Sequence, residues 1–203
     1  MTPELMAARL GKVTASRMAD LCAKTKTGYG ASRRNYLAQL VAERLTGAAQ
    51  ESYSNAAMQW GVENEGFAAD AYSFRTGLDV EVCGFYDHPT IPMSGASPDR
   101  LVGNDGLLEV KCPNTATHID TLLDDSVDGK YILQMQWQMA CTGRQWCDFV
   151  SFDPRLPERL RLFVRRVPRD AEKIAELEKE TRLFLRELDG KIAALNMVME
   201  KAA

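Results

Sequence analysis

The sequence lacks a long hydrophobic run, an excess of positive charge, and any internal repeat or low-complexity segment. Without an apolar run long enough to cross a bilayer, we expect no membrane-spanning segment and no membrane partner. The net charge of −3 is not typical of a nucleic-acid-binding protein. Any contact with DNA would therefore need a local basic lining, or an assembly that encloses the DNA.

Cysteine is also scarce: there are five, an odd number, and none is spaced as a zinc ligand pair. Such cysteines suit a reducing compartment, where they serve as small apolar side chains. No signal peptide is recognisable at residues 1–4, so we expect a cytoplasmic protein. With 203 residues, 45% of them hydrophobic, we expect a single domain over residues 1–203. The cysteines are Cys22, Cys83, Cys112, Cys141 and Cys147.

Residues 94–113 are the most informative stretch of the chain. The sequence Gly-Asn-Asp-Gly at residues 103–106 predicts a hairpin turn. On either side, residues 96–102 and 107–112 have the composition of strands. We therefore expect two antiparallel strands joined by this turn.

The length of the hairpin loop decides which side chains meet. A two-residue loop would place Asp99 and Glu109 on opposite faces of the hairpin. A three-residue loop, residues 103–105, would set Asp99 directly across from Glu109. We predict the three-residue loop, bulged through a residue with positive φ.

The same hairpin predicts a metal site. Glu109 and Lys111 are two apart in a strand and share a face, whereas Val110 points the other way. With Asp99 opposite, two carboxylates and an ammonium would converge, which suits Mg²⁺ with a lysine to orient or help deprotonate a water. The alternative is a solvent-exposed strand face with ordinary salt bridges.

Two other segments could contact phosphate. Residues 16–22 predict a short helix that Thr14 or Ser16 could cap, and its free N–H groups, together with Arg9, could seat a phosphate. Residues 24–34 read as a loop with four positive charges and no acid, which could follow a DNA backbone. The alternatives are ordinary capping beside a surface arginine, and a flexible solvated loop. The basic residues of that loop are Lys24, Lys26, Arg33 and Arg34.

Two helices follow, over residues 35–46 with Asn35 as its cap and over residues 55–76, and they end at Gly47 and Gly77. In the second helix Glu65 falls on an apolar stripe, where a carboxylate needs a cation or a metal as partner. Glu65 is therefore a candidate third ligand, with a buried salt bridge as the alternative. Those stripes consist of Trp60, Phe67, Ala71 and Phe74, and of Met58, Val62, Ala69 and Tyr72.

The remaining elements can be outlined from their patterns. Strands are expected at residues 80–85, 145–153 and 159–167, a turn at 86–89, and a loop with a short helix at 114–130. Helices are expected at residues 131–142, with Gln134 and Gln138 on one face, and at 170–201. The apolar positions of the last helix include Ile174, Leu177, Phe184, Leu188 and Leu195. We expect His88 and His118 to lie at the surface. The alternatives are that Asp87 or His88 borders the metal site and that His118 meets a phosphate.

Seven motifs occur in one order along the chain: RLGKVTAS, YLAQLVAERLTG, QWGVENE, GASPDRL, LLEVKCP, YILQMQWQM and FDPR. With Asp99 and Glu109-Val110-Lys111, they resemble the family of phage lambda exonuclease and the YqaJ-type viral recombinases, within the PD-(D/E)xK nuclease superfamily. The resemblance implies an α/β, restriction-endonuclease-like core: a central mixed β-sheet flanked by α-helices. It also implies a phage- or prophage-encoded protein acting in a bacterial host.

The activity implied by the resemblance is a magnesium-dependent exonuclease. It would degrade one strand of linear double-stranded DNA from the 5′ end, release mononucleotides and leave 3′ single strands. Two Mg²⁺ ions per site are implied, with Mn²⁺ able to substitute. A ring-shaped homotrimer and a single-strand annealing protein as partner are implied as well.

The resemblance also implies roles for individual residues. Asp99, Glu109 and the Val110 carbonyl match metal ligands, Lys111 the catalytic lysine, Glu65 the helix glutamate, and Gln134 a glutamine near the nucleophile. The positions that match a 5′-phosphate pocket are Arg9, Ser16 and Ser97. Met58 could wedge into the terminal base pair, or pack in the core.

The chain departs from the family pattern at two positions. Pro89 stands where a family member has an aspartate, and Asp87 is displaced from it by two residues. Thr117 stands where a phosphate-pocket arginine is expected, although His118 is adjacent. A restriction-like endonuclease, a Cas4-like nuclease and a non-catalytic DNA-end-binding protein remain alternatives; the cysteine spacing disfavours the iron–sulfur cluster of the second.

Overall fold

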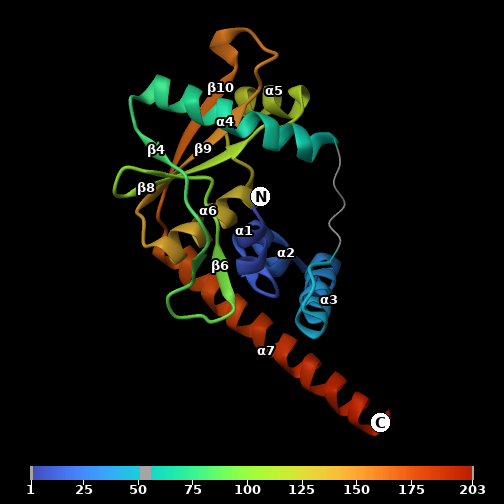
Figure 1. Ribbon diagram of the computed structural model, residues 1–203. Coiled ribbons are helices and arrows are strands. Elements are labelled where there is room, and N and C mark those ends of the chain that lie inside the picture. Colours follow the sequence, from blue (N-terminus) through green and yellow to red (C-terminus); the bar gives the residue numbers. More distant parts are fainter. Residues whose placement is uncertain (1, 51–55, 203) are drawn as a thin grey trace.

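The computed structural model describes residues 2–50 and 56–202 of the chain (Figure 1). Its α-helices are α1 (Pro3–Arg9), α2 (Met18–Cys22), α3 (Ala31–Thr46), α4 (Ala56–Thr76), α5 (Thr115–Asp124), α6 (Gly129–Thr142) and α7 (Ala171–Ala202). Two short 3₁₀ helices are η1 (Ala15–Arg17) and η2 (Glu158–Leu160). The strands are β1 (Val13–Thr14), β2 (Lys24–Thr25), β3 (Gly28–Tyr29), β4 (Val80–Glu81), β5 (Tyr86–Asp87), β6 (Ser94–Ala96), β7 (Arg100–Val102), β8 (Gly106–Lys111), β9 (Trp146–Phe152) and β10 (Leu162–Pro168).

A five-stranded mixed sheet with the order β10-β9-β8-β7-β4 forms the centre of the molecule. Only β8 and β9 are parallel within it, and helices α5 and α6 connect them. A parallel pair needs such a crossover, whereas the antiparallel pairs are joined by shorter connections. The short strands β1, β6 and β5 form a second sheet, and β2 and β3 form a small hairpin. The expected mixed sheet flanked by helices is therefore confirmed.

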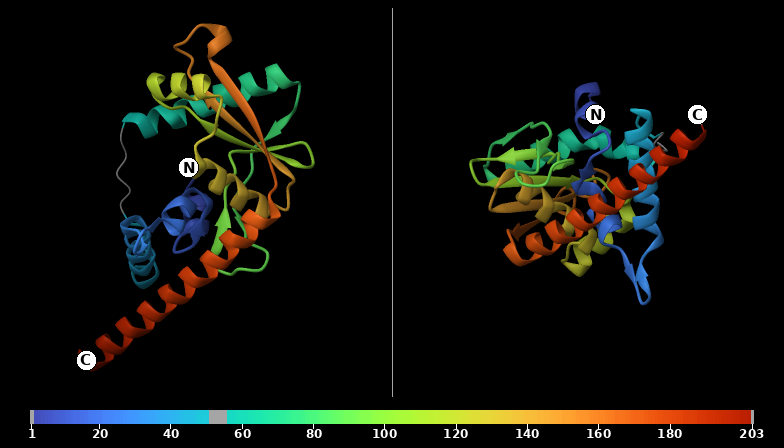
Figure 2. Two further views of the ribbon diagram at one scale, coloured as in Figure 1. Left: turned by 180° about the vertical axis from the view of Figure 1, so that it is seen from behind. Right: turned by 90° about the horizontal axis from the view of Figure 1, so that it is seen from below.

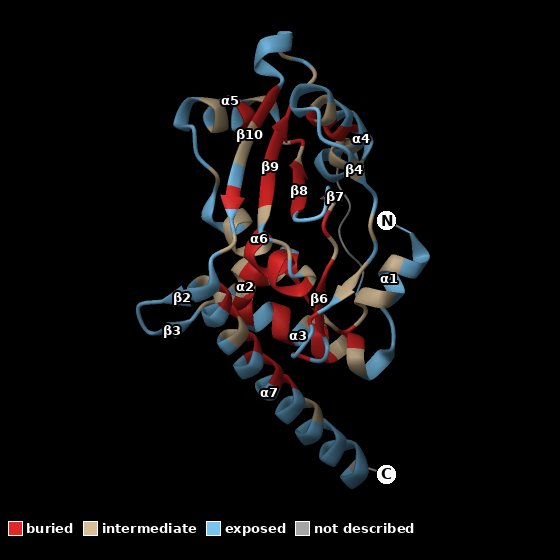
Figure 3. Cartoon of the chain, turned by 90° about the vertical axis from the view of Figure 1, so that its left-hand side faces the viewer, coloured by how far each residue is buried: buried red, intermediate tan, exposed pale blue. Residues whose placement is uncertain are grey.

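Helices cover both faces of the five-stranded sheet. Small residues and one tyrosine of α4 pack on one face, against Leu108 and Val110 of β8. Met135 and Met139 of α6 pack on the other face, against Leu107. Successive strand residues point to opposite faces, so Glu109 faces α6. The buried residues therefore concentrate in β8, β9 and α6, as Figure 3 shows.

A second core joins α2, α3, α6 and α7 beside the sheet. It is built around Tyr36 and Phe184, whose rings stack with centroids 5.4 Å apart. Beyond this core α7 extends away from the rest of the molecule (Figures 1 and 2). Leu195, one of the apolar positions of this helix, lies on that extension and is 41% exposed.

The central hairpin has the predicted three-residue loop. Arg100 pairs with Leu108 and Val102 with Gly106, which leaves residues 103–105 as the loop. Gly103 supplies the positive φ, at 49°, and the three strand pairs run on without a bulge. Gly106 has no room for a side chain, because a Cβ there would lie 2.2 Å from the Trp146 ring.

The first strand of the hairpin is shorter than expected. Residues 96–102 divide into the end of β6 and the whole of β7, with residues 97–99 between them. Pro98 lies in this break and cannot donate a backbone hydrogen bond to a ladder. The division matters for function, because it frees the chain at Asp99 from strand pairing.

Several helix boundaries also differ from expectation. Helix α3 begins at Ala31 after Gly30 rather than at Asn35, and β2 and β3 replace much of the expected loop. The short helix near Ser16 starts as η1, and the Thr14 side chain makes no capping hydrogen bond. The ends at Gly47 and Gly77 are confirmed, as both residues have the left-handed conformation.

The two expected apolar stripes of α4 are confirmed only in part: Ala69 and Tyr72 are buried, and Trp60 and Ala71 pack against the core. Phe67 and Phe74 are 66% and 93% exposed, whereas the buried residues of the helix are Asn64, Ala68, Ala69 and Tyr72. Small alanines let the helix lie close to the sheet, so the larger apolar side chains on its flanks stay outside. Residue 55, where this helix is expected to begin, lies outside the described residues.

The outer strands and the C-terminal elements were predicted with mixed success. Strands β9 and β10 pair along their whole length, as expected for residues 145–153 and 159–167. Only Val80–Glu81 of the expected strand at 80–85 is paired, and the expected turn at 86–89 contains β5. Leu45 of α3 is 42% exposed. No helix in the described ranges is long and apolar enough to cross a membrane.

Candidate active site

Asp99 lies at the point where β7 separates from β8. Its Oδ2 atom accepts a hydrogen bond from the Val110 backbone N–H at 2.7 Å. In a continued β7–β8 ladder the residue across from Val110 would be Pro98, and its carbonyl would accept that N–H. The Asp99 side chain takes the place of this missing ladder bond. The carboxylate is thereby held beside Glu109, as the three-residue loop predicts.

Glu109 is held by polar side chains from one face of α6. The side chain is fully buried. Its Oε1 atom accepts a hydrogen bond from Gln134 Nε2 and its Oε2 atom accepts one from Gln138 Nε2, each at 2.6 Å. The two glutamines are one helical turn apart and therefore share a face of the helix. Lys111, two residues further along β8, donates a hydrogen bond to the same Oε1. These three donors fix the orientation of the carboxylate.

The electrostatics of this cluster follow from two acids close together. Burial, followed by the negative charge of Glu109, raises the pKa of Asp99 well above its usual range, with a smaller contribution from Glu65. Burial alone would lower the pKa of Lys111, but the charges of Glu109 and Asp99 outweigh it and raise that pKa. Lys111 is therefore an ammonium ion at neutral pH.

Glu65 approaches the same region from α4. It lines one cavity with Asp99, Arg100, Arg9 and Ser97, and the cavity has a volume of about 550 Å³. Its Oε1 atom accepts a hydrogen bond from Arg100 Nη1 at 2.7 Å. The partner that the sequence requires for this carboxylate is thus, in this structure, the Arg100 guanidinium.

The residues expected to bind a phosphate meet at Arg9, which lines that cavity with Ser97 and a neighbouring cavity with Ser16. Arg9 donates from Nη1 to Ser97 Oγ at 3.2 Å and from Nη2 to Ser16 Oγ at 3.5 Å. Burial lowers the pKa of Arg9, while the negative charge of Glu109 acts in the opposite direction. An arginine and two hydroxyls therefore gather within electrostatic reach of the carboxylates. The structure brings together residues that are 88 positions apart in the sequence.

The carboxylates suit a divalent metal in their chemistry. Asp99 and Glu109 are hard oxygen donors of like charge, and after burial the charge of Glu109 is the largest cause of the raised pKa of Asp99, although Lys111 acts in the opposite direction. Within residues 2–50 and 56–202, however, no three His, Cys, Asp or Glu side chains are placed to hold one ion together. Glu65 is drawn to Arg100 instead, and Glu63 of the same helix is exposed.

The basic residues of segment 24–34 do not form one exposed cluster. Arg33 is 3% exposed, pairs with Glu187 of α7 and stacks on Tyr29 at 3.8 Å. Lys24 pairs with Glu180, also of α7, at 2.6 Å. The expectation of a solvated loop is wrong for Arg33, and for Lys24 the positive charge is already matched. Lys26 and Arg34 are exposed, and so is Met58 at 53%.

Both histidines are buried, which contradicts their expected surface position. His118 is fully buried and lies 2.7 Å from Ser151 Oγ and 2.8 Å from the Leu160 carbonyl, so it is not placed to meet a phosphate. His88 is 6% exposed and stacks on Trp137, with centroids 4.8 Å apart. Neighbouring Asp87 instead points outward and pairs with Lys12 at 2.6 Å.

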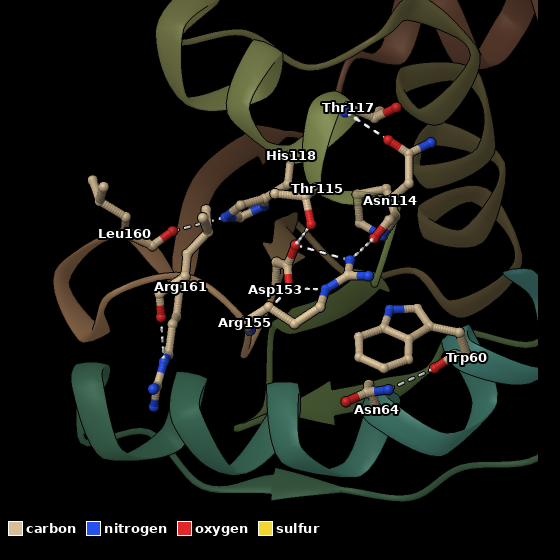
Figure 4. A network of polar contacts seen from close by, with 12 residues as sticks. Trp60, Asn64, Asn114, Thr115, Thr117, His118, Asp153, Arg155, Leu160 and Arg161 are labelled. Atoms are coloured by element: carbon tan, nitrogen blue, oxygen red, sulfur yellow. Dashed lines mark hydrogen bonds and ion pairs between the residues drawn. The ribbon is translucent and has the colours of Figure 1, made fainter.

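A polar network braces the end of β9 near α4 and α5 (Figure 4). Asp153 is fully buried and accepts hydrogen bonds from Thr115 at 2.6 Å and from Arg155. The Arg155 guanidinium also lies over the Trp60 ring of α4, 4.3 Å from its centroid. The FDPR motif is therefore structural here: it ties together the helices on either side of the strand.

The fold and the carboxylate–lysine cluster define a nuclease of the PD-(D/E)xK class. The family model described as the YqaJ-like viral recombinase domain matches residues 4–145, and the chain belongs to that family. No curated protein matches the chain.

Solved structures agree with this assignment. The chain is similar to an alkaline exonuclease (LHK-Exo) from Laribacter hongkongensis, at 52% identity over 100% of both chains with a TM-score of 0.94. A structure of LHK-Exo in complex with dAMP matches at 53% identity, again over 100% of both chains with a TM-score of 0.94. A phage-related exonuclease from Haemophilus somnus 129PT covers 91% of this chain and 96% of its own at 17% identity and a TM-score of 0.75, which shows the shared fold alone.

Two residues of the site could not be assigned from the sequence. Gln138 shares a helix face with Gln134, which was a recognisable signal, but only the structure shows that it binds the second oxygen of Glu109. Arg100 follows Asp99 directly and gave no signal of its own. Its role depends on the distance between β7 and α4, which sequence patterns do not report.

Proposed function

We propose that this protein is a magnesium-dependent 5′→3′ exonuclease that degrades one strand of linear double-stranded DNA. The products would be mononucleotides and a 3′ single-stranded overhang for recombination by strand annealing. The observation that carries the proposal is the placement of Glu109 and Lys111 beside Asp99, next to a cavity that also holds Arg9 and Ser97. The 52% identity to an alkaline exonuclease supports it.

In this proposal Asp99, Glu109 and Glu65 hold two Mg²⁺ ions, for which Mn²⁺ can substitute. When bound, the ions supply a polarised water and stabilise the attacking and leaving oxygens of the phosphodiester. The Val110 carbonyl is a further ligand, because the N–H and C=O of one strand residue point to the same side and the N–H already faces Asp99.

The residues of the chain have distinct tasks around the reacting phosphate. Lys111, protonated at neutral pH, donates a hydrogen bond that orients the attacking water and stabilises negative charge on the phosphate. Gln134 is shared between Glu109 and the site of attack, where its amide positions the water. Gln138 keeps Glu109 in place by its hydrogen bond to the Oε2 atom.

The direction of digestion would follow from the Arg9 pocket. An arginine with two hydroxyls suits a terminal phosphate, since charge-assisted hydrogen bonds to phosphate oxygens are strong. A 5′-phosphate bound by Arg9, Ser16 and Ser97 would present the first phosphodiester to the carboxylates. The cavity of about 550 Å³ lies within the usual range of ligand sites, about 300–1,000 Å³.

The proposed assembly is a homotrimeric ring that works with a single-strand annealing protein. A ring would keep the duplex threaded without a basic exterior, in keeping with the net charge of −3. Lys26, Arg34 and Met58 are the exposed candidates for contact with the duplex. We place the enzyme in the bacterial cytoplasm, where phage DNA is recombined.

One experiment tests the reaction and the direction together. Linear duplex DNA labelled at either its 5′ or its 3′ end is incubated with the protein and Mg²⁺, beside a sizing measurement of the oligomer. Early release of a 5′-labelled mononucleotide, with the 3′ label retained in long strands, is expected. Release of the 3′ label first, or cleavage in the presence of EDTA, would refute the proposal.

A further inference from the structure

Arg100 links the catalytic hairpin to α4 through a single nitrogen. It pairs with Leu108 in the sheet and so faces the α4 side. Its Nη1 atom donates to Glu65 Oε1 at 2.7 Å and to the Asp99 carbonyl oxygen at 2.5 Å. The Arg100 guanidinium is therefore anchored beside Asp99, the first carboxylate of the cluster.

The position of Arg100 accounts for the incomplete acidic cluster. Glu65 lies close enough to Asp99 for its charge to act on that carboxyl group, and both line the same cavity. Yet among the residues that the structure describes, no three ligand-type side chains are placed to hold one ion. Glu65 would be the third metal-binding carboxylate, but it is already paired with the Arg100 guanidinium.

We propose that Arg100 is an exchangeable counterion of Glu65, which a divalent metal must displace before Glu65 can become a ligand. This inference rests on the proposed metal-dependent function and adds a positioning residue to it. Without metal, Arg100 neutralises Glu65 and keeps α4 joined to the hairpin. With metal, Glu65 changes partner, so binding of the Glu65-dependent ion is opposed by the ion pair.

The geometry suits exchange rather than a permanent structural bridge. The Glu65 and Arg100 side chains are 35% and 17% exposed, so water can solvate both groups when they separate. Ion pairs that water reaches are weak, and a metal with two charges can replace the guanidinium. A fully buried pair would instead resist separation.

The test measures Mn²⁺ binding, in the absence of DNA, by electron paramagnetic resonance of the free ion. Arg100→Gln removes the competing charge, and we expect it to tighten the weaker, Glu65-dependent Mn²⁺ site by about three- to tenfold. Arg100→Lys, which keeps a cation, should remain closer to the unsubstituted protein. Arg165→Gln is the matched control, because it removes one arginine charge from an ion pair with Asp125 outside the cavity.

A double variant separates exchange from a general effect of charge. In a Glu65→Gln background, Arg100→Gln should no longer change Mn²⁺ affinity, because the carboxylate for which they compete is gone. An undiminished gain in that background, or unchanged or weaker Mn²⁺ binding in Arg100→Gln alone, would overturn the inference while the proposed function stands. If the unsubstituted protein binds no Mn²⁺, the proposed function fails, and the inference with it.

Discussion

Asp99 Oδ2 accepts a hydrogen bond from the Val110 N–H at 2.7 Å, so a side chain takes the place of a strand partner. This contact fixes Asp99 across from Glu109. It also explains why the strand must break at this point. A continuous β7 would pair the Val110 N–H with the backbone of residue 98, and the Asp99 carboxylate would lose this contact.

We expect Lys111→Ala to abolish cleavage while DNA binding is retained. The ammonium beside Glu109 acts on the reacting groups and does not bind the rest of the duplex. The rate of cleavage should therefore fall by about 10²–10⁴. The rate of mononucleotide release and the Kd for duplex in Ca²⁺ are the two measurements.

The control for this variant is Lys130→Ala. Lys130 and Lys111 both lie over the Tyr131 ring, at 4.8 and 5.2 Å from its centroid, but Lys130 pairs with the exposed Asp128. Its loss should leave cleavage unchanged. Equal losses in the two variants would show that Lys111 supports the structure and not the chemistry.

Arg9→Ala should selectively weaken the preference for 5′-phosphorylated ends. Loss of one charge-assisted contact should reduce digestion of phosphorylated duplex by about ten- to a hundredfold, and digestion of 5′-hydroxyl duplex much less. Lys12→Ala is the matched control, because this nearby cation pairs with Asp87 instead of Ser97. An equal decrease on both kinds of end would remove the pocket assignment.

A covalently closed circular duplex should remain intact under conditions that digest the same DNA after linearisation. The reason is that the proposed phosphate pocket requires a free end. The measurement is agarose gel electrophoresis over time with both substrates present. Nicking or linearisation of the circle at a comparable rate would favour the restriction-like endonuclease.

Asp153 provides a prediction about stability and pH. Burial would raise its pKa, but hydrogen bonds from Arg155 and Thr115 outweigh burial and lower the pKa from 3.8 to about 2. The ionised group is therefore stabilising above pH 4, and that contribution is lost as the pH falls toward 2. Asp153→Asn should lower the free energy of unfolding by about 2 kcal/mol at pH 7.

The measurement is urea denaturation of both proteins between pH 7 and pH 3. The difference in the free energy of unfolding should narrow below pH 4, because the acid and the amide then become alike in charge. A difference that stays constant over this range would mean that the contacts of Asp153 stabilise the fold without its charge.

The hairpin was predictable because its information is local. The turn residues, the alternation of strand faces and the positions of Asp99, Glu109 and Lys111 all lie within residues 94–113. The loop length then followed from the requirement that the two acids meet. The bulge and the full-length first strand were wrong, because Pro98 and the contact of Asp99 with Val110 end the pairing early.

Features that depend on distant contacts were harder to predict. His118 looks like a surface residue on a polar segment, yet Ser151 and Leu160 enclose it. Arg33 looks like a DNA contact, yet α7 supplies Glu187 and buries it. In each case the partner is more than 30 residues away, and local pattern contains no record of it.

Diffraction from crystals soaked in Mn²⁺, at a concentration that supports cleavage, tests the central claim most directly. The account predicts an anomalous peak between the carboxylates of Asp99 and Glu109. Well-diffracting crystals with manganese elsewhere, or with none at these two residues, would contradict it.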